Sequence, residues 1–153
     1  MEIVYTDGAT VGHNGKLGTV SEVGIGVYFA NRNKRMYARM PGISNNEAEY
    51  KALITAMQLC IKYGIKDVEF RCDSQNIVNG ANTKTRKDKQ KDTPKAHASN
   101  RMNAFKRQIH ELRKQLRFVS FVWIPRELNG IADELSKKAS MPCKQDVCRR
   151  TSF

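Results

Sequence analysis

Four acidic residues stand at the junctions between short apolar segments and polar ones. Asp7 and Asp73 each follow a run rich in apolar and β-branched residues, Glu49 lies near the start of an amphipathic stretch, and Asp133 opens another. When a compact fold packs such segments together, the side chains at their ends are brought close to one another. Clustered carboxylates repel, and a bound divalent cation offsets that repulsion. The four residues therefore indicate a metal-dependent hydrolase.

The alternation of apolar runs and turn residues predicts an α/β domain. The expected order is strand, strand, strand, helix, strand, helix, helix, strand, helix, over residues 2–6, 23–30, 34–40, 45–63, 67–72, 74–81, 102–117, 118–124 and 130–139. The helix between strands 2–6 and 67–72 makes these strands parallel, because such a crossover returns the chain in the same direction. Asp7 and Asp73 follow these two strands, so they are expected at one edge of the sheet.

The helix expected over 45–63 also places Glu49. Its core-facing residues recur at helical spacing, at Leu53, Ala56, Cys60 and Tyr63. Four positions before Leu53 is Glu49, which therefore lies on the buried face, whereas Glu47 points away from it. A carboxylate in a core stripe is costly unless a cation or hydrogen bonds satisfy it. Taken alone, Glu49 could equally pair with the N-terminus of its own helix.

Length and composition restrict the class of protein. The 153 residues suit one domain, which we expect over 1–140, followed by a polar tail over 141–153. No apolar run approaches the ~20 residues that span a bilayer, and the N-terminus lacks the pattern of a secretory signal. No Cys-x-x-Cys pair is present, which argues against a zinc site and favours a reduced, cytoplasmic protein with Cys60 and Cys72 as buried thiols.

Positive charge is concentrated in one stretch of the chain. Residues 80–117 carry 12 Lys and Arg against 3 Asp and Glu, so +9 of the total net charge of +12 is found there. Within this stretch, residues 82–100 are expected to form a mobile, basic loop. A polyanion is the expected partner, because Lys and Arg contacts with phosphates release counterions. A solvated basic surface is the alternative.

The order of elements and four short motifs resemble ribonuclease H of type 1 over about residues 1–139. The motifs are Tyr5-Thr6-Asp7-Gly8, Ser44-Asn45-Asn46-x-x-Glu49, Cys72-Asp73-Ser74-Gln75 and Ala132-Asp133-Glu134-Leu135. Each is weak alone, but four in order on the right elements are specific. The resemblance implies an α/β, ribonuclease H-like fold. Its five-stranded mixed sheet has the first three strands antiparallel and the rest parallel to the first, flanked by helices.

The resemblance also implies an activity and a site. Asp7, Glu49, Asp73 and Asp133 would be the catalytic residues and would hold two Mg²⁺ or Mn²⁺ ions roughly 3.5–4 Å apart. The substrate would be an RNA/DNA hybrid, its RNA strand hydrolysed to 5′-phosphate and 3′-hydroxyl ends by a cytoplasmic monomer. The substrate-binding residues would read the 2′-hydroxyls of the RNA strand, and by motif they are Gly8, Asn45, Asn46 and Gln75.

Three departures from the family pattern are visible. The histidine that many bacterial members carry before the last aspartate is absent, and Arg126 or Glu127 could take its place. A family asparagine that helps to hold phosphate would align with His13 or Asn14. The basic segment 82–100 has no aromatic residue, so stacking cannot contribute there.

Two rival functions use the same residues differently. The first is a nuclease of this fold acting on double-stranded RNA or on DNA junctions, but amides that read sugar edges have no use on pure DNA. The second is a non-catalytic nucleic-acid-binding module. Four intact carboxylates argue against it, because a carboxylate cluster beside a polyanion site is unfavourable without cations.

Overall fold

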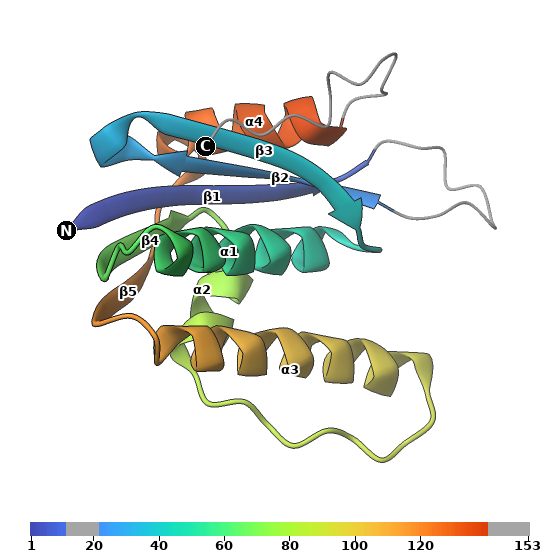
Figure 1. Ribbon diagram of the computed structural model, residues 1–153. Coiled ribbons are helices and arrows are strands. Elements are labelled where there is room, and N and C mark those ends of the chain that lie inside the picture. Colours follow the sequence, from blue (N-terminus) through green and yellow to red (C-terminus); the bar gives the residue numbers. More distant parts are fainter. Residues whose placement is uncertain (12–21, 141–153) are drawn as a thin grey trace.

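The computed structural model describes residues 1–11 and 22–140. Within them a mixed sheet has the strand order β3-β2-β1-β4-β5 (Figure 1). The strands are β1 Glu2–Thr10, β2 Glu22–Phe29, β3 Lys34–Pro41, β4 Asp67–Cys72 and β5 Phe118–Trp123, and the helices are α1 Asn45–Lys62, α2 Gln75–Asn82, α3 Pro94–Arg113 and α4 Gly130–Ser140. β1 pairs antiparallel with β2 and parallel with β4. The fold expected from the sequence is confirmed.

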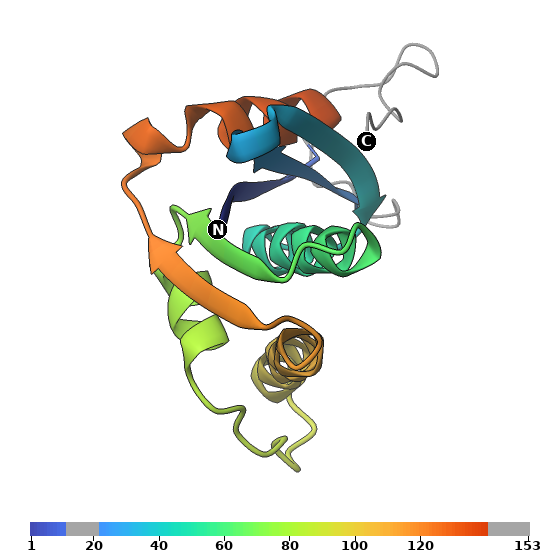
Figure 2. The ribbon, with the colours of Figure 1, turned by 60° about the vertical axis from the view of Figure 1, so that its left-hand side comes forward.

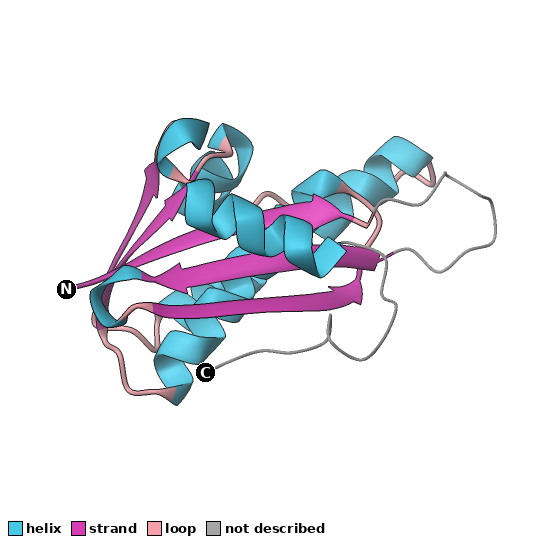
Figure 3. Cartoon of the chain, turned by 90° about the horizontal axis from the view of Figure 1, so that it is seen from above, coloured by secondary structure: helices cyan, strands magenta, loops and turns pink. Residues whose placement is uncertain are grey.

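Helices cover both faces of the sheet (Figures 2 and 3). α1 packs on β1 and β2 from one side, and α4 packs on β1, β2 and β3 from the other. The core between α1 and the sheet is built from fully buried residues of both layers, among them Ile25, Leu53, Met57 and Phe70. Cys60 and Cys72 are free and buried, as predicted. Among the described residues, no helix is long and apolar enough to cross a membrane.

β1 is longer than the sequence suggested. Its parallel pairing with β4 stops at Thr6 opposite Cys72, but its antiparallel pairing with β2 continues through Asp7 opposite Gly26 to Thr10 opposite Val23. The expected end of the strand at Asp7 was therefore wrong. Asp7 lies inside β1, where the neighbouring strand on one side has ended and the one on the other side has not.

α1 begins and ends at the expected signals. The Ser44 side chain accepts a hydrogen bond from the Glu47 backbone N–H and so caps the helix, and Gly64 follows its end with a left-handed φ of 73°. One residue of the predicted core stripe was wrong: Tyr63 is 42% exposed, because it lies beyond the last helical residue.

α3 begins eight residues before the predicted start at Met102, at Pro94. Thr93 caps it by accepting a hydrogen bond from the Ala96 N–H, and Pro94 occupies the first turn, where its missing N–H costs nothing. The loop expected over 82–100 therefore ends at Thr93. The error arose because the first two turns of α3 are mostly exposed and carry no apolar periodicity.

The loop before α3 returns along that helix (Figure 1). The Asp88 carboxylate accepts hydrogen bonds from Arg107 and Asn103. The Lys89 backbone N–H donates to the Asn100 side chain, and its carbonyl accepts a bond from the same side chain. Side chains of α3 thus set the position of the basic loop. The expected tail 141–153, with Cys143 and Cys148, lies outside the described residues.

Candidate active site

Three carboxylates from three separate elements meet at one end of the sheet. They are Asp7 on β1, Glu49 on α1 and Asp73 directly after β4, and one oxygen from each lies within 4.8 Å of the others. Asp7 and Glu49 are each 7% exposed, whereas Asp73 is half-buried. Oxygen atoms of this kind and spacing are the donors that Mg²⁺ and Mn²⁺ prefer. The donor set therefore fits a hard divalent cation.

Asp133 lines the same pocket but stands outside this group of three. The pocket has a volume of about 410 Å³, and its walls include Asp7, Glu49, Asp73 and Asp133. One Asp133 oxygen lies 3.0 Å from the Lys137 ammonium, one helical turn further along α4. The structure thus brings all four predicted carboxylates to one pocket, with Asp133 at its rim.

A close approach between β1 and α1 positions Glu49. The Gly8 N–H donates a hydrogen bond of 2.7 Å to Glu49 Oε1. A Cβ atom on Gly8 would lie 2.3 Å from the carbonyl carbon of Ala48 and 2.7 Å from the Glu49 nitrogen. Only glycine leaves room for this approach, so the Asp7-Gly8 dipeptide supplies a carboxylate and the space that lets Glu49 reach it.

The pKa values of Asp7 and Glu49 are both raised in the metal-free protein. Burial raises the pKa of Glu49 to about 9, and its hydrogen bond with Asp7 and the Asp7 charge contribute in the same direction. Burial also raises the pKa of Asp7, to which Asp73 and Asp133 add, although hydrogen bonds from Glu49 and Ser136 oppose the shift. With this raised pKa, Glu49 holds its proton at neutral pH and can donate it in a hydrogen bond to Asp7.

Two further side chains hold the carboxylates, and neither was predicted from the sequence. The Ser136 hydroxyl lies 2.6 Å from Asp7 Oδ2. The Asn129 amide donates bonds of 3.0 Å to both Asp73 Oδ2 and the Thr6 carbonyl. Both residues flank Asp133 in the chain, but only the packing of α4 on the sheet shows which carboxylates they reach.

The predicted substrate-binding residues divide into two sets. Gly8, Asn45 and Asn46 line the carboxylate pocket, and Asn45 also accepts a hydrogen bond from the Thr10 N–H. Gln75 is exposed at the first residue of α2 and does not line that pocket. The structure therefore places three of the four predicted substrate-binding residues at the carboxylate pocket and Gln75 outside it.

Of the two residues that could take the place of the missing histidine, Arg126 is the one that lies at the pocket. This residue lines the pocket, whereas Glu127 does not. His97 pairs with Asp92 and His110 contacts Thr85, so neither faces the carboxylates. His13 and Asn14, the candidates for holding phosphate, lie outside the described residues.

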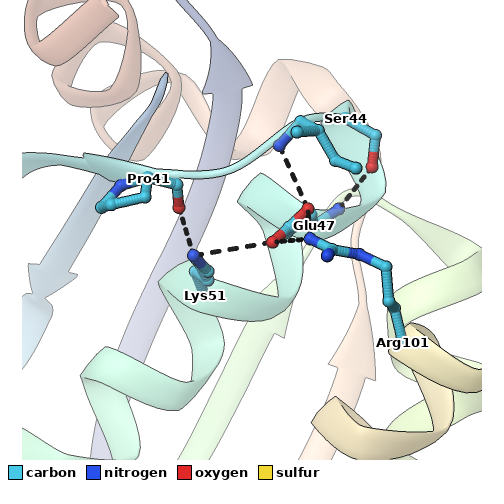
Figure 4. Close-up of polar contacts among 6 residues, drawn as sticks. Pro41, Ser44, Glu47, Lys51 and Arg101 are labelled. Atoms are coloured by element: carbon cyan, nitrogen blue, oxygen red, sulfur yellow. Dashed lines mark hydrogen bonds and ion pairs between the residues drawn. The ribbon is translucent and has the colours of Figure 1, made fainter. Parts of the chain in front are cut away.

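Glu47 is buried, which the helical spacing did not predict, and Figure 4 shows the polar contacts that surround it. It points away from the pocket, but α3 covers it. Its carboxylate accepts two bonds of 2.7 and 2.8 Å from Arg101 and one from the Ile43 N–H, with Lys51 at 3.6 Å. Burial alone would raise the pKa of Glu47, but these partners outweigh it and lower the pKa. Glu47 is a structural anion between α1 and α3.

Comparison with known proteins agrees with the architecture. A family model described as "Reverse transcriptase-like" matches residues 22–139. A ribonuclease H1 obtained from compost by a metagenomic approach, LC11-RNase H1, has 29% identity and a TM-score of 0.65 over 90% of this chain and 93% of its own. The same protein in complex with an RNA/DNA hybrid matches with 28% identity and a TM-score of 0.60, over 90% of this chain and 95% of its own.

An archaeal structure extends the similarity. The RNase H1 of Halobacterium salinarum has 24% identity and a TM-score of 0.61, covering 90% of this chain and 95% of its own. At that identity the likeness concerns the fold. Together with the family match, this likeness agrees with the ribonuclease H-like α/β fold. The chain belongs to the reverse transcriptase-like family of ribonuclease H-like proteins.

The raised pKa of Glu49 predicts a pH dependence of metal binding. Because the pKa of Glu49 is raised from 4.5 to about 9, the metal-free fold loses stability as the pH rises through that interval, and a cation must displace the proton. We expect Mn²⁺ affinity to rise by up to about tenfold per pH unit between pH 6 and 8. Calorimetry in buffers of different ionisation enthalpy measures the affinity and the released proton together. A pH-independent affinity without proton release would contradict a protonated Glu49.

Proposed function

We propose that this protein is a divalent-metal-dependent endoribonuclease that hydrolyses the RNA strand of RNA/DNA hybrids and leaves 5′-phosphate and 3′-hydroxyl ends. The observation that carries the proposal is the meeting of Asp7, Glu49 and Asp73, from three separate elements, within 4.8 Å at an open pocket. The family match and the hybrid complex of LC11-RNase H1 support the same substrate.

The carboxylates together would coordinate two Mg²⁺ or Mn²⁺ ions. Asp7, which lies within 4.8 Å of both Glu49 and Asp73, would be the ligand common to the two ions, while Asp133 and Lys137 line the same pocket. When bound, the ions supply an activated water and stabilise the leaving oxygen. Burial of Asp7 and Glu49 keeps both carboxylates fixed before substrate arrives.

Recognition of RNA would fall to the amides and the backbone beside the carboxylates. Asn45 and Asn46 are exposed at the first turn of α1 and line the pocket with Gly8. An amide side chain both donates and accepts hydrogen bonds, which suits a 2′-hydroxyl. Gln75 begins the helix that follows Asp73, so it would contact the substrate one step further from the cut.

The basic stretch would bind the phosphates of the hybrid. Most of its lysines are exposed on the loop before α3, and Lys89, Lys91 and Lys95 line a hollow of about 630 Å³ at the start of that helix. Contacts of this kind strengthen binding without reading sequence.

We expect Lys87, Lys89 and Lys91 to contribute affinity but not catalysis. Changing all three to Gln should raise KM several-fold and flatten the dependence of binding on salt, by roughly 0.7–0.9 in slope per lost phosphate contact. The turnover number should change far less, because these contacts are equally strong in the ground state and the transition state. Hybrid titrations at several salt concentrations measure both quantities. An unchanged salt slope would mean that the loop is only a solvated surface.

The proposed cut is tested by the position of the label and the chemistry of the ends. A hybrid labelled on its RNA strand should be cut internally, and the same hybrid labelled on its DNA strand should stay intact. The RNA products should accept a 5′ label from a kinase only after phosphatase treatment. DNA cleavage, or 3′-phosphate ends, would refute the proposed reaction. A monomer acting in the cytoplasm belongs to the same proposal, and sizing by light scattering tests the first part.

A further inference from the structure

Ser136 stands beside the candidate metal site although no motif includes it. Its hydroxyl oxygen lies 2.6 Å from Asp7 Oδ2 and 2.9 Å from the backbone carbonyl of Asp133, and the residue is fully buried. A hydroxyl has one proton to donate. The shorter distance falls in the range of charge-assisted O–H···O⁻ bonds, so the proton goes to Asp7 when that carboxylate is ionised.

Two glycines of β2 make this contact possible. Gly26 is the direct partner of Asp7 in the ladder between β1 and β2. A Cβ atom on Gly26 would lie 2.4 Å from the Ala132 carbonyl oxygen and 2.7 Å from the Ser136 nitrogen. A Cβ atom on Gly24 would lie 2.7 Å from the Ser136 carbonyl oxygen. Because both residues are glycines, α4 can lie directly on β2, and Ser136 occupies the space next to Asp7.

We propose that Ser136 is a positioning residue for the metal site, whose hydroxyl fixes the orientation of the Asp7 carboxylate. The inference rests on the proposed function, in which Asp7 is the ligand shared by both cations. Ser136 occupies one acceptor position on Oδ2, while the Asp7 residue also lines the pocket with Glu49 and Asp73. Hydrogen bonds to a metal-ligating carboxylate commonly set its orientation and strengthen metal binding.

The same helix holds a second carboxylate in a comparable way. Asn129, at the start of α4, donates to Asp73 Oδ2 and to the Thr6 carbonyl, and its own carbonyl accepts the Asp133 N–H. α4 therefore carries Asp133 and also holds Asp73 and Asp7. Ser136 is the better residue to test, because truncating Asn129 would also leave the buried Thr6 carbonyl without this donor.

Direct measurement of Mn²⁺ binding without substrate tests the inference. We compare the wild-type chain with Ser136→Ala, with Ser136→Cys, which keeps a weaker donor of similar size, and with Ser140→Ala. Ser140 is the matched control, because its hydroxyl bonds the Lys137 carbonyl on the same helix just as Ser136 bonds that of Asp133. Thermal melts of the metal-free proteins establish that each variant folds.

We expect Ser136→Ala to weaken Mn²⁺ binding by about tenfold, Ser136→Cys to fall in between, and Ser140→Ala to stay within twofold of wild type. If Ser136→Ala lowers only the metal-free melting temperature and keeps wild-type Mn²⁺ affinity, Ser136 has only a structural role. That result would overturn the inference about Ser136 but leave the proposed function untouched. If the wild-type chain itself does not bind Mn²⁺, the metal site of the proposed function is refuted, and the role of Ser136 with it.

Discussion

The Asp7→Asn variant should lose at least about 100-fold in cleavage rate. Substituting a residue that only supports a metal ligand costs roughly 10- to 100-fold in activity, and loss of a ligand itself should cost more. Asp7 interacts with three other residues of the site. It accepts the Ser136 hydroxyl, is hydrogen-bonded to Glu49 and lies near Asp73. An amide is neutral and offers one oxygen, so it cannot supply the charge that two cations need.

The same variant should fold at least as well as wild type without metal. The asparagine oxygen can still accept the Ser136 hydroxyl, and its N–H₂ can donate to Glu49. Removing one buried negative charge relieves the repulsion that raises the pKa of both carboxyl groups. Thermal melts with and without Mg²⁺ measure this: wild type should gain stability from the ion and the variant should not. Near-wild-type turnover by Asp7→Asn would refute the site.

A second large effect is expected at Glu49, with Glu47 as its matched control. Glu49→Gln removes a carboxylate that lies within 4.8 Å of two others and should lower the turnover number by at least about 100-fold. Glu47→Gln, two residues away on the same helix, changes a side chain that does not line the pocket and should keep turnover within a few-fold. Both substitutions replace a glutamate by glutamine on α1, so they differ only in the face of the helix that is altered.

The structure adds a stability effect to that comparison. Glu47 holds Arg101 and Lys51 from a buried position, so Glu47→Gln should destabilise the fold by about 1–3 kcal/mol, the cost of weakening hydrogen bonds to charged groups. Glu49→Gln should instead leave the metal-free fold as stable as wild type, because Glu49 is already protonated at neutral pH. Denaturant unfolding and steady-state kinetics on both variants separate the two roles. Equal losses of activity would show that the register of α1 is wrong.

Local signals predicted much of the fold. Apolar runs, the Ser44 cap and Gly64 placed α1 within a residue at each end, and the crossover rule gave the parallel pairing of β1 and β4. The meeting of Asp7, Glu49 and Asp73 followed from the same reasoning, because it depends on which ends of the elements share an edge of the sheet.

Features that depend on packing between distant elements could not be predicted. Pairing with β2 extends β1 through Asp7, and burial of Glu47 depends on Arg101, which is far away in the chain. The contact between Ser136 and Asp7 requires the close approach of α4 that two glycines permit. The start of α3 was signalled locally by Thr93-Pro94, but its exposed first turns hid the apolar periodicity that marks a helix.

One cleavage assay tests the central claim most directly. The same labelled RNA strand is presented alone, paired with DNA and paired with RNA, each with Mg²⁺, with Mn²⁺ and with a chelator, and Asp7→Asn is run beside the wild-type chain. We predict internal cleavage of the RNA in the hybrid with either ion, none with chelator or with Asp7→Asn, and little or none of the other two substrates. Cleavage that persists in chelator, or that favours the RNA duplex over the hybrid, would contradict the proposed function.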